Sequence, residues 1–320
     1  MKKDTAIGLQ ATQSMEEAGR KVFVYHFNDL LKQESGTRLG EDIEALHNMR
    51  VATRRMRAAV RIFENGFTPS ALKFLKIGLK ETAQFLGSVR DLDVFIEKVT
   101  VYQQELTIDK QTGLTPLLNH CYRQRNLART KMLSYLDSKK YKKFKEKTAR
   151  FVKKNNTKNV AISFDKPTPF QIRHVAPLLL YNRYETLCAY EPFLNNASVE
   201  QLHQLRIDFK HFRYALENFQ EILGDESLLI LSEIKQIQDC LGNLNDARVG
   251  CELVKNFLNN WKKYRKSLNM NKAKKPVAVI DYLKIKTTEC EQLLTTFPNV
   301  WHEFNSTKLR NHLALAVANL

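Results

Sequence analysis

The segment LHNMRVATRRMRAAVRIFE at residues 46–64 recurs in altered form as LHQLRIDFKHFRYALENFQ at residues 202–220. Farther along the chain, LGSVRDLDV at 86–94 recurs as LGNLNDARV at 241–249. The two pairs repeat after 156 and 155 residues, and such agreement between separate blocks indicates an internal duplication. We therefore expect the 320 residues to form two related halves.

Apolar residues recur at helical spacing along most of the chain. Glycine and proline, with 11 and 8 occurrences, are scarce. A helix break is expected at LGS, residues 86–88, and the only strand candidate is NVAISF at 159–164. We predict an all-α fold. In the first half the spacing predicts helices over 15–31, 43–64, 71–86, 92–106 and 117–136.

The middle of the chain is strongly basic. Residues 139–158 hold ten lysines or arginines and a single carboxylate, Glu146. This composition predicts an exposed basic helix that runs into a linker. A second basic run, at 261–276, is predicted to be a loop between two late helices. We accordingly divide the chain into a first helical half at 1–138, a lysine-rich helix and linker at 139–168, and a second helical half at 169–320.

The overall charge favours a polyanionic partner. Lysine and arginine number 51 against 34 acidic residues, a net charge of +17. The five cysteines are widely spaced without a CxxC pair, which is typical of reduced thiols. The N-terminal sequence lacks the apolar core of a signal peptide, and no apolar run reaches the length of about 18 residues that a membrane span needs. We expect a cytoplasmic protein.

The first repeated segment carries a stripe of positive charge on one side of a helix. At about 100° per residue, its basic residues share an arc of about 80°. Like charges three and four residues apart each destabilise a helix by about 0.2–0.5 kcal/mol, and a bound polyanion removes that cost. Arginine suits phosphate because its planar guanidinium donates two parallel hydrogen bonds. The stripe consists of His47, Arg50, Arg54, Arg57 and Arg61, with His203, Arg206, Lys210 and Arg213 in the same arc of the second copy.

Internal acids offer a different explanation for the charge. Asp91, Asp93 or Asp246 could neutralise part of the stripe through salt bridges. Glu217 stands at the position equivalent to Arg61 and is expected to close that end of the second stripe. Asp91 and Asp246 also follow the expected LG break, where we interpret them as structural caps of the next helix.

Both repeated blocks resemble the CHAD family, the conserved histidine α-helical domain. They match its His-x-x-Arg-x-x-x-Lys/Arg-x-x-Arg helix in each half, followed by an LG-x-x-R/N-D turn, and the resemblance extends roughly over residues 14–296. It implies two helical bundles related by a pseudo-twofold axis, with the basic helices facing a central channel. It also implies binding of inorganic polyphosphate, in some members on storage granules. The residues that it assigns to polyphosphate are His47, Arg50, Arg54, Arg57, His203, Arg206, Lys210 and Arg213. Weaker candidates for anion binding are Arg20, Arg55, Arg61, Lys80, Arg173 and Lys235.

We predict a non-catalytic polyphosphate-binding protein that needs no cofactor or metal. One alternative is a nucleic-acid-binding protein, although the first stripe lacks the aromatic residues on which single-stranded bases stack. Another is a metal-dependent phosphohydrolase that uses the paired histidines, although the chain has no HExxH motif and no acidic cluster for magnesium. A granule-coat protein would overlap with the first hypothesis. Chain-length preference, downstream role and oligomeric state are not predicted.

Overall fold

The computed structural model describes residues 7–153, 170–261, 263, 265 and 276–320. This part of the chain is helical and contains no β-strand, so the all-α prediction is confirmed. An isolated bridge between Ser14 and Gln171 is the one strand-like pairing in the same residues. The strand candidate at 159–164 and most of the basic run at 261–276 lie outside the described residues.

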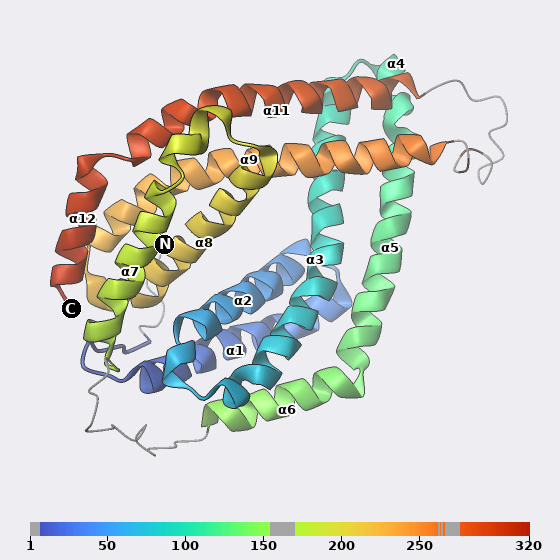
Figure 1. The fold of residues 1–320 in the computed structure, drawn as a ribbon. Coiled ribbons are helices and arrows are strands. Elements are labelled where there is room, and N and C mark those ends of the chain that lie inside the picture. Colours follow the sequence, from blue (N-terminus) through green and yellow to red (C-terminus); the bar gives the residue numbers. More distant parts are fainter. Residues whose placement is uncertain (1–6, 154–169, 262, 264, 266–275) are drawn as a thin grey trace.

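The helices form two groups that follow each other in sequence (Figure 1). The first group consists of α1 (Met15–Leu39), α2 (Ile43–Ile62), η1 (Glu64–Gly66), α3 (Pro69–Glu105), α4 (Ile108–Gln111), η2 (Thr112–Leu114), α5 (Thr115–Asp137) and α6 (Lys139–Lys153). The second group consists of α7 (Ile172–Cys188), η3 (Glu191–Asn196), α8 (Val199–Leu223), α9 (Glu226–Asn259), α11 (Val277–Phe304) and α12 (Thr307–Ala318). None of the helices in the described residues is both long and apolar enough to cross a lipid bilayer.

The two basic segments lie on α2 and α8, which start at equivalent residues. Asp42 caps α2 by accepting a hydrogen bond from the backbone N–H of Glu44 at 2.8 Å. Ser198, its counterpart in the repeat, caps α8 by accepting from the backbone N–H of Gln201 at 3.2 Å. Such caps stabilise a helix by about 0.5–2 kcal/mol. Each signature histidine therefore sits at the same distance from the start of its helix.

The helix break predicted at 86–88 is wrong. α3 continues through Gly87 as one helix of 37 residues, and α9 continues through Gly242 as one of 34 residues. A glycine inside a helix costs only about 1 kcal/mol, and no proline follows to stop the chain. Asp91 and Asp246 thus lie inside continuous helices, and the prediction that they cap a new helix is wrong as well.

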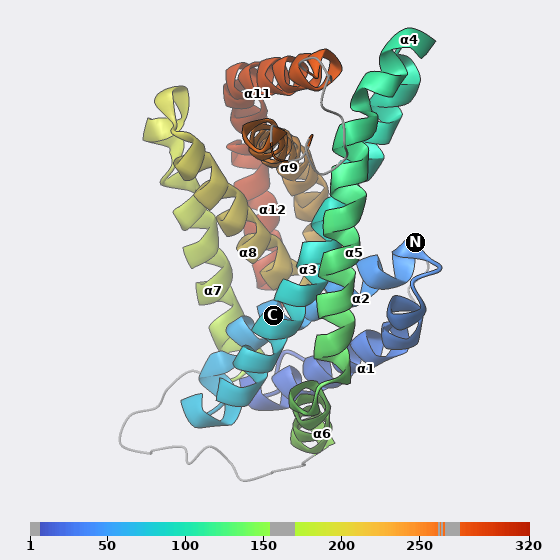
Figure 2. The ribbon, with the colours of Figure 1, turned by 90° about the vertical axis from the view of Figure 1, so that its right-hand side faces the viewer.

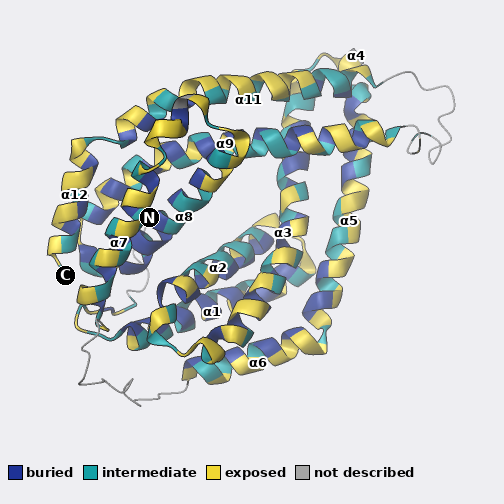
Figure 3. Cartoon of the chain, in the orientation of Figure 1, coloured by how far each residue is buried: buried dark blue, intermediate teal, exposed yellow. Residues whose placement is uncertain are grey.

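One apolar core extends across both groups of helices. Buried residues line the sides of the helices that face their neighbours (Figure 3). At the centre, the rings of Phe63 on the end of α2 and Phe219 on α8 meet edge to face, with centroids 5.6 Å apart. A smaller cluster joins the far ends of α3 and α5 to α9 and α11, where Phe95 contacts Tyr282. Figure 2 shows α3 and α5 side by side along their length up to α4.

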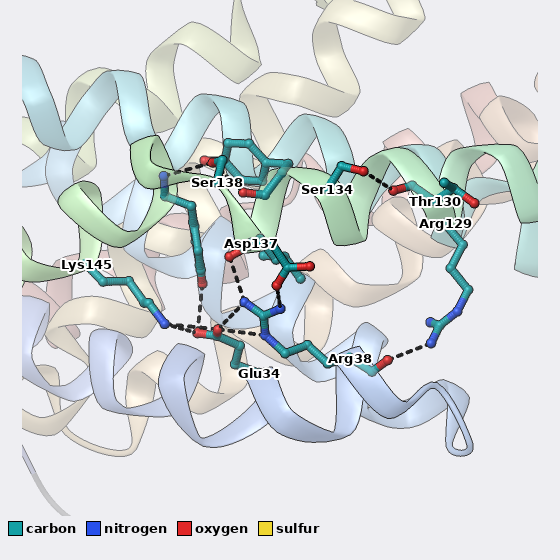
Figure 4. Close-up of polar contacts among 11 residues, drawn as sticks. Glu34, Arg38, Arg129, Thr130, Ser134, Asp137, Ser138 and Lys145 are labelled. Atoms are coloured by element: carbon teal, nitrogen blue, oxygen red, sulfur yellow. Dashed lines mark hydrogen bonds and ion pairs between the residues drawn. The ribbon is translucent and has the colours of Figure 1, made fainter.

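α6 has the exposed basic side that its composition predicts, but its other side is packed. Phe144 is buried against Gly78 of α3, where there is no room for a side chain. Glu34 of α1 accepts hydrogen bonds from Lys145 at 2.8 Å and from the Tyr141 hydroxyl at 3.1 Å, and it pairs with Arg38 at 2.9 Å (Figure 4). α6 is thus an integral part of the first group of helices. The linker predicted to follow it lies outside the described residues.

Candidate functional site

α2 and α8 cross at the centre of the molecule through reciprocal contacts. Arg55 of α2 faces Glu217 of α8 at 3.9 Å, and Arg61 of α2 contacts the Nε2 atom of His211 on α8. In the repeat alignment, Arg61 is equivalent to Glu217 and Arg55 to His211, so each contact is the counterpart of the other. Two equivalent helices that cross on a twofold axis produce this pattern. It supports the predicted duplication and pseudo-twofold axis, which stay predictions.

The crossing brings basic residues of both stripes together. Burial and the neighbouring Arg206, Arg54, Arg50 and Arg213 lower the pKa of Lys210 to about 7. Arg50 and Arg54 of α2 therefore lie close enough to act on Lys210 of α8. Burial and neighbouring arginines also lower the pKa of Arg54 and of Arg206. We call these five residues the central cluster: Arg50, Arg54, Arg206, Lys210 and Arg213.

Tyr214 lies beneath the central cluster. The guanidinium carbons of Arg54 and Arg213 lie 5.8 Å and 5.3 Å from the centroid of its ring, within the range of cation–π attraction. Its hydroxyl group is buried without a hydrogen-bond partner, and so is the Nε atom of Arg54. Most buried polar groups in proteins are hydrogen-bonded, so these two donors mark a place where a ligand could supply acceptor oxygens.

Acidic side chains neutralise part of the positive charge, which the sequence analysis had considered as an alternative. Arg50 pairs with Asp91 at 3.2 Å, and Arg213 pairs with Glu217 at 3.1 Å, as predicted for that end of the second stripe. Asp246 instead receives Lys98 from α3, at 2.8 Å, and Asp93 pairs with Arg125 away from the stripe. Among the described residues, no carboxylate lies within ion-pair distance of Arg54, Arg57, Arg206 or Lys210. The central cluster therefore keeps a surplus of positive charge.

The two signature histidines occupy the first turns of the stripes. His47 is half-buried, and its pKa is lowered by burial and by the nearby charge of Arg90 on α3, with smaller contributions from Arg54 and Arg50. His203 is exposed at the rim of a shallow pocket between α8 and α9. That pocket is lined by Val199, Leu202, His203, Arg206, Leu241, Leu244, Asn245 and Arg248.

Two of the weaker candidates, Arg20 and Arg173, make contacts outside the central cluster. Arg20 uses its guanidinium within the fold, pairing with Glu16 at 2.8 Å and donating to the Phe151 carbonyl at 2.7 Å. Arg173 is exposed at the start of α7 and donates to Gln171 at 2.8 Å. The remaining two, Lys80 on α3 and Lys235 on α9, are exposed, and a role for them in anion binding stays a prediction.

The other two weaker candidates, Arg55 and Arg61, lie at the crossing itself. Sequence reasoning missed two residues that lie near the stripes, Arg90 and Arg183. Arg90 acts on His47, and its place in the repeated block LGSVRDLDV was a usable signal. Arg183 of α7 donates to the backbone carbonyl of His211, and because it falls outside the aligned blocks the sequence contained no signal for it.

The described residues contain no group of three or more histidine, cysteine, aspartate or glutamate side chains arranged to hold a metal ion. Most of the charged groups at the crossing are cations, and Glu217 neutralises only part of them. Such an arrangement attracts anions and repels divalent metals.

Comparison with known proteins agrees with this architecture. No curated protein matches the chain. The crystal structure of the CHAD domain from the plant Ricinus communis is similar with a TM-score of 0.70 and 19% sequence identity, covering 93% of this chain and 95% of that chain. The structure of PptA from Streptomyces chartreusis is similar with a TM-score of 0.66 and 15% identity, covering 91% of this chain and 100% of that chain. A family model of the CHAD domain matches residues 22–255, which include both basic helices and most of the chain, and the protein therefore belongs to the CHAD domain family.

Proposed function

We propose that this protein binds inorganic polyphosphate between the basic faces of α2 and α8, without acting on it catalytically. The observation that carries this proposal is the environment of Lys210, which lies among four arginines with no carboxylate of the described residues within ion-pair distance. Repulsion among these cations makes the empty site unfavourable, and a bound anion removes it. The binding residues we propose are His47, Arg50, Arg54, Arg57, His203, Arg206, Lys210 and Arg213.

A linear polymer of phosphates suits this site better than a single anion. From residue 47 to residue 57 the stripe extends over about 15 Å of helix, so its cations face several successive phosphate groups. Nucleic acid would supply a similar charge. However, Tyr214, the aromatic residue beside the central cluster, is buried beneath the arginines and offers no exposed face for base stacking.

Charge reversal at the centre tests the proposal. Replacing Arg54 and Lys210 together by glutamate removes two charge-assisted contacts, each worth about 1.5–3 kcal/mol, and adds repulsion. The affinity for long-chain polyphosphate should fall by more than about a hundredfold, as measured by isothermal titration calorimetry at physiological salt. A matched control replaces Lys131 on α5 and Lys255 on α9, two exposed lysines away from the site, by glutamate. If both double variants bind equally well, the proposal is wrong.

Three further measurements separate the alternatives. Competition by DNA and RNA should displace polyphosphate only at large excess, and equal competition would favour a nucleic-acid-binding function. Incubation of polyphosphate with the protein and magnesium or manganese should release no phosphate, whereas release would indicate a phosphohydrolase.

We also propose that the protein associates with polyphosphate granules. A tagged copy should then coincide with a granule stain and lose that position when Arg54 and Lys210 are reversed.

A further inference from the structure

The two sides of the α2–α8 crossing differ in charge. On the side toward α1, Glu217 lies between Arg55 at 3.9 Å and Arg213 at 3.1 Å. Asp29 of α1 is also close enough for Arg55 to act on its pKa, which burial raises and Arg55 lowers. Acidic residues therefore neutralise the arginines on this side.

The side toward α7 is cationic instead. Arg61 takes the position that Glu217 holds in the other copy, and His211 takes the position of Arg55. Arg61 donates to the His211 imidazole, and Arg183 of α7 donates to the His211 backbone carbonyl. One residue of α8 thus holds two guanidinium groups that come from different helices. Arg57, one turn before Arg61 on α2, adds a further cation to this side. Burial and the charge of Arg61 lower its pKa.

The nearest acid on this side, Asp208, offsets only part of the positive charge. Asp208 accepts a hydrogen bond from the Tyr190 hydroxyl at 2.7 Å and from Gln204 at 3.2 Å, and it lies 3.7 Å from the Nδ1 atom of His211. Within the described part of the chain Asp208 forms no ion pair with Arg61 or Arg183, although its charge opposes the lowering of the pKa of Arg183 and of His211.

The electrostatic consequences agree with this geometry. Burial and Arg61 lower the pKa of Arg183 to about 10. Burial, Arg61 and Arg183 lower the pKa of His211 to about 4, so His211 is neutral at physiological pH and can accept the hydrogen bond from Arg61. Its role is to orient the two guanidinium groups, which are the groups able to bind an anion.

We propose that Arg61 and Arg183, held by His211, form a second anion subsite that extends the polyphosphate track past the crossing onto α7. This inference rests on the proposed function. Arg50, the first residue of the central cluster on α2, and Arg61 are separated by about 16.5 Å along the helix, so a polyphosphate that fills the central cluster and the subsite must span at least that distance. Because Glu217 neutralises the arginines on the opposite side, we expect no equivalent extension of the track there.

Glutamine variants of Arg61 and Arg183 test the subsite with two probes, long-chain polyphosphate and tripolyphosphate. The double variant R61Q/R183Q should bind the long chain at least tenfold more weakly. The slope of log affinity against log salt should become shallower by about 1.4, the value for two lost contacts to a flexible polyanion at about 0.7 each. Affinity for tripolyphosphate, which the central cluster accommodates alone, should change less than threefold. The single variant Arg183→Lys keeps the positive charge at this position and should retain most of the wild-type affinity for the long chain.

Substitution on the opposite side provides the comparison. Arg55→Gln removes a cation that Glu217 already neutralises and should change long-chain affinity less than twofold. The subsite is refuted if R61Q/R183Q binds the long chain as R55Q does, or if both probes lose affinity equally.

Should R61Q/R183Q lose its structure, as judged by circular dichroism, the single variant R61Q decides the matter, because Arg61 is exposed. R61Q should then show about half of the change in slope. If the wild-type protein binds no polyphosphate, both proposals fail. If R54E/K210E loses binding while R61Q/R183Q retains it, only the subsite fails.

Discussion

Lys210 should make polyphosphate binding depend on pH above neutrality. Burial and the surrounding arginines hold the pKa of its amine at about 7, so the amine is mostly neutral in the free protein at higher pH. A bound polyanion favours the charged form. Binding above pH 7 must therefore take up a proton, and the affinity should fall as the pH rises.

The size of the effect follows from the two states of the amine. If polyphosphate restores Lys210 to the ordinary lysine pKa of about 10.5, linkage predicts that affinity falls about twentyfold between pH 7.5 and 9.0. Histidines are neutral throughout this interval and contribute little. The variant Lys210→Arg stays charged at every pH in the interval, and its affinity should change less than about threefold.

Calorimetric titration with long-chain polyphosphate at constant ionic strength measures both quantities. Long chains keep the titrating end groups a small fraction of the ligand. Repeating the titration in two buffers of different ionisation enthalpy should show uptake of nearly one proton per site near pH 8.5 for the wild type, and almost none for K210R. Identical pH dependence of the two proteins would refute the reasoning.

Without ligand, the lowered pKa of Lys210 also determines the direction in which the free energy of unfolding changes with pH. Between about pH 7 and the ordinary lysine pKa, the unfolded chain holds a proton that folded Lys210 has lost. The free energy of unfolding should therefore rise with pH in this interval, and K210R should lack the rise.

Three other substitutions test the packing and the site. Tyr214→Phe removes a buried hydroxyl that has no partner, so it should raise the free energy of unfolding by up to about 1 kcal/mol and weaken polyphosphate binding severalfold; lower stability with unchanged binding would contradict this. Phe144→Ala should lower the free energy of unfolding in urea by about 3–5 kcal/mol, because its ring fills the space at Gly78; a loss below about 1 kcal/mol would mean that α6 is not packed as described. Glu34→Gln should cost about 1–3 kcal/mol at pH 7, where hydrogen bonds from Lys145 and Arg38 outweigh burial and lower the pKa of Glu34. Because that stability is lost as the pH falls through the lowered pKa, wild type and E34Q should become equally stable in acid.

Much of the fold could be predicted because its signals are local. Helical spacing and the scarcity of glycine and proline both act within a few residues of the chain. The LG segments misled the prediction, because a glycine inside a helix is a weak signal. Whether α3 stops there depends on the burial of Leu86 and Val89 against other helices, which outweighs the cost of Gly87.

In the candidate site, too, the features that depend on local spacing could be predicted, whereas contacts between distant residues could not. The repeat and the 3.6-residue period placed the cations of each stripe on one side of one helix. They also located Glu217 as the acid that interrupts the second stripe, which its pairing with Arg213 bears out. Arg20 and Arg173 were weaker candidates for anion binding, and the structure places their guanidinium groups in contact with Glu16 and Gln171.

The sequence by itself determined that this protein is helical, that two of its helices carry similar cationic stripes, and that each stripe has an apolar side opposite. Only the tertiary structure decided that Arg50 and Arg54 of one stripe come close to Lys210 of the other, and that Arg183 joins one side of the crossing while Glu217 neutralises arginines on the other. The reason is physical. A charge pattern on a helix depends on spacing within the chain, but the repulsion felt by Lys210 depends on its distance to arginines on another helix. That distance is set by the packing of Phe63 against Phe219, residues that lie 156 positions apart in the chain.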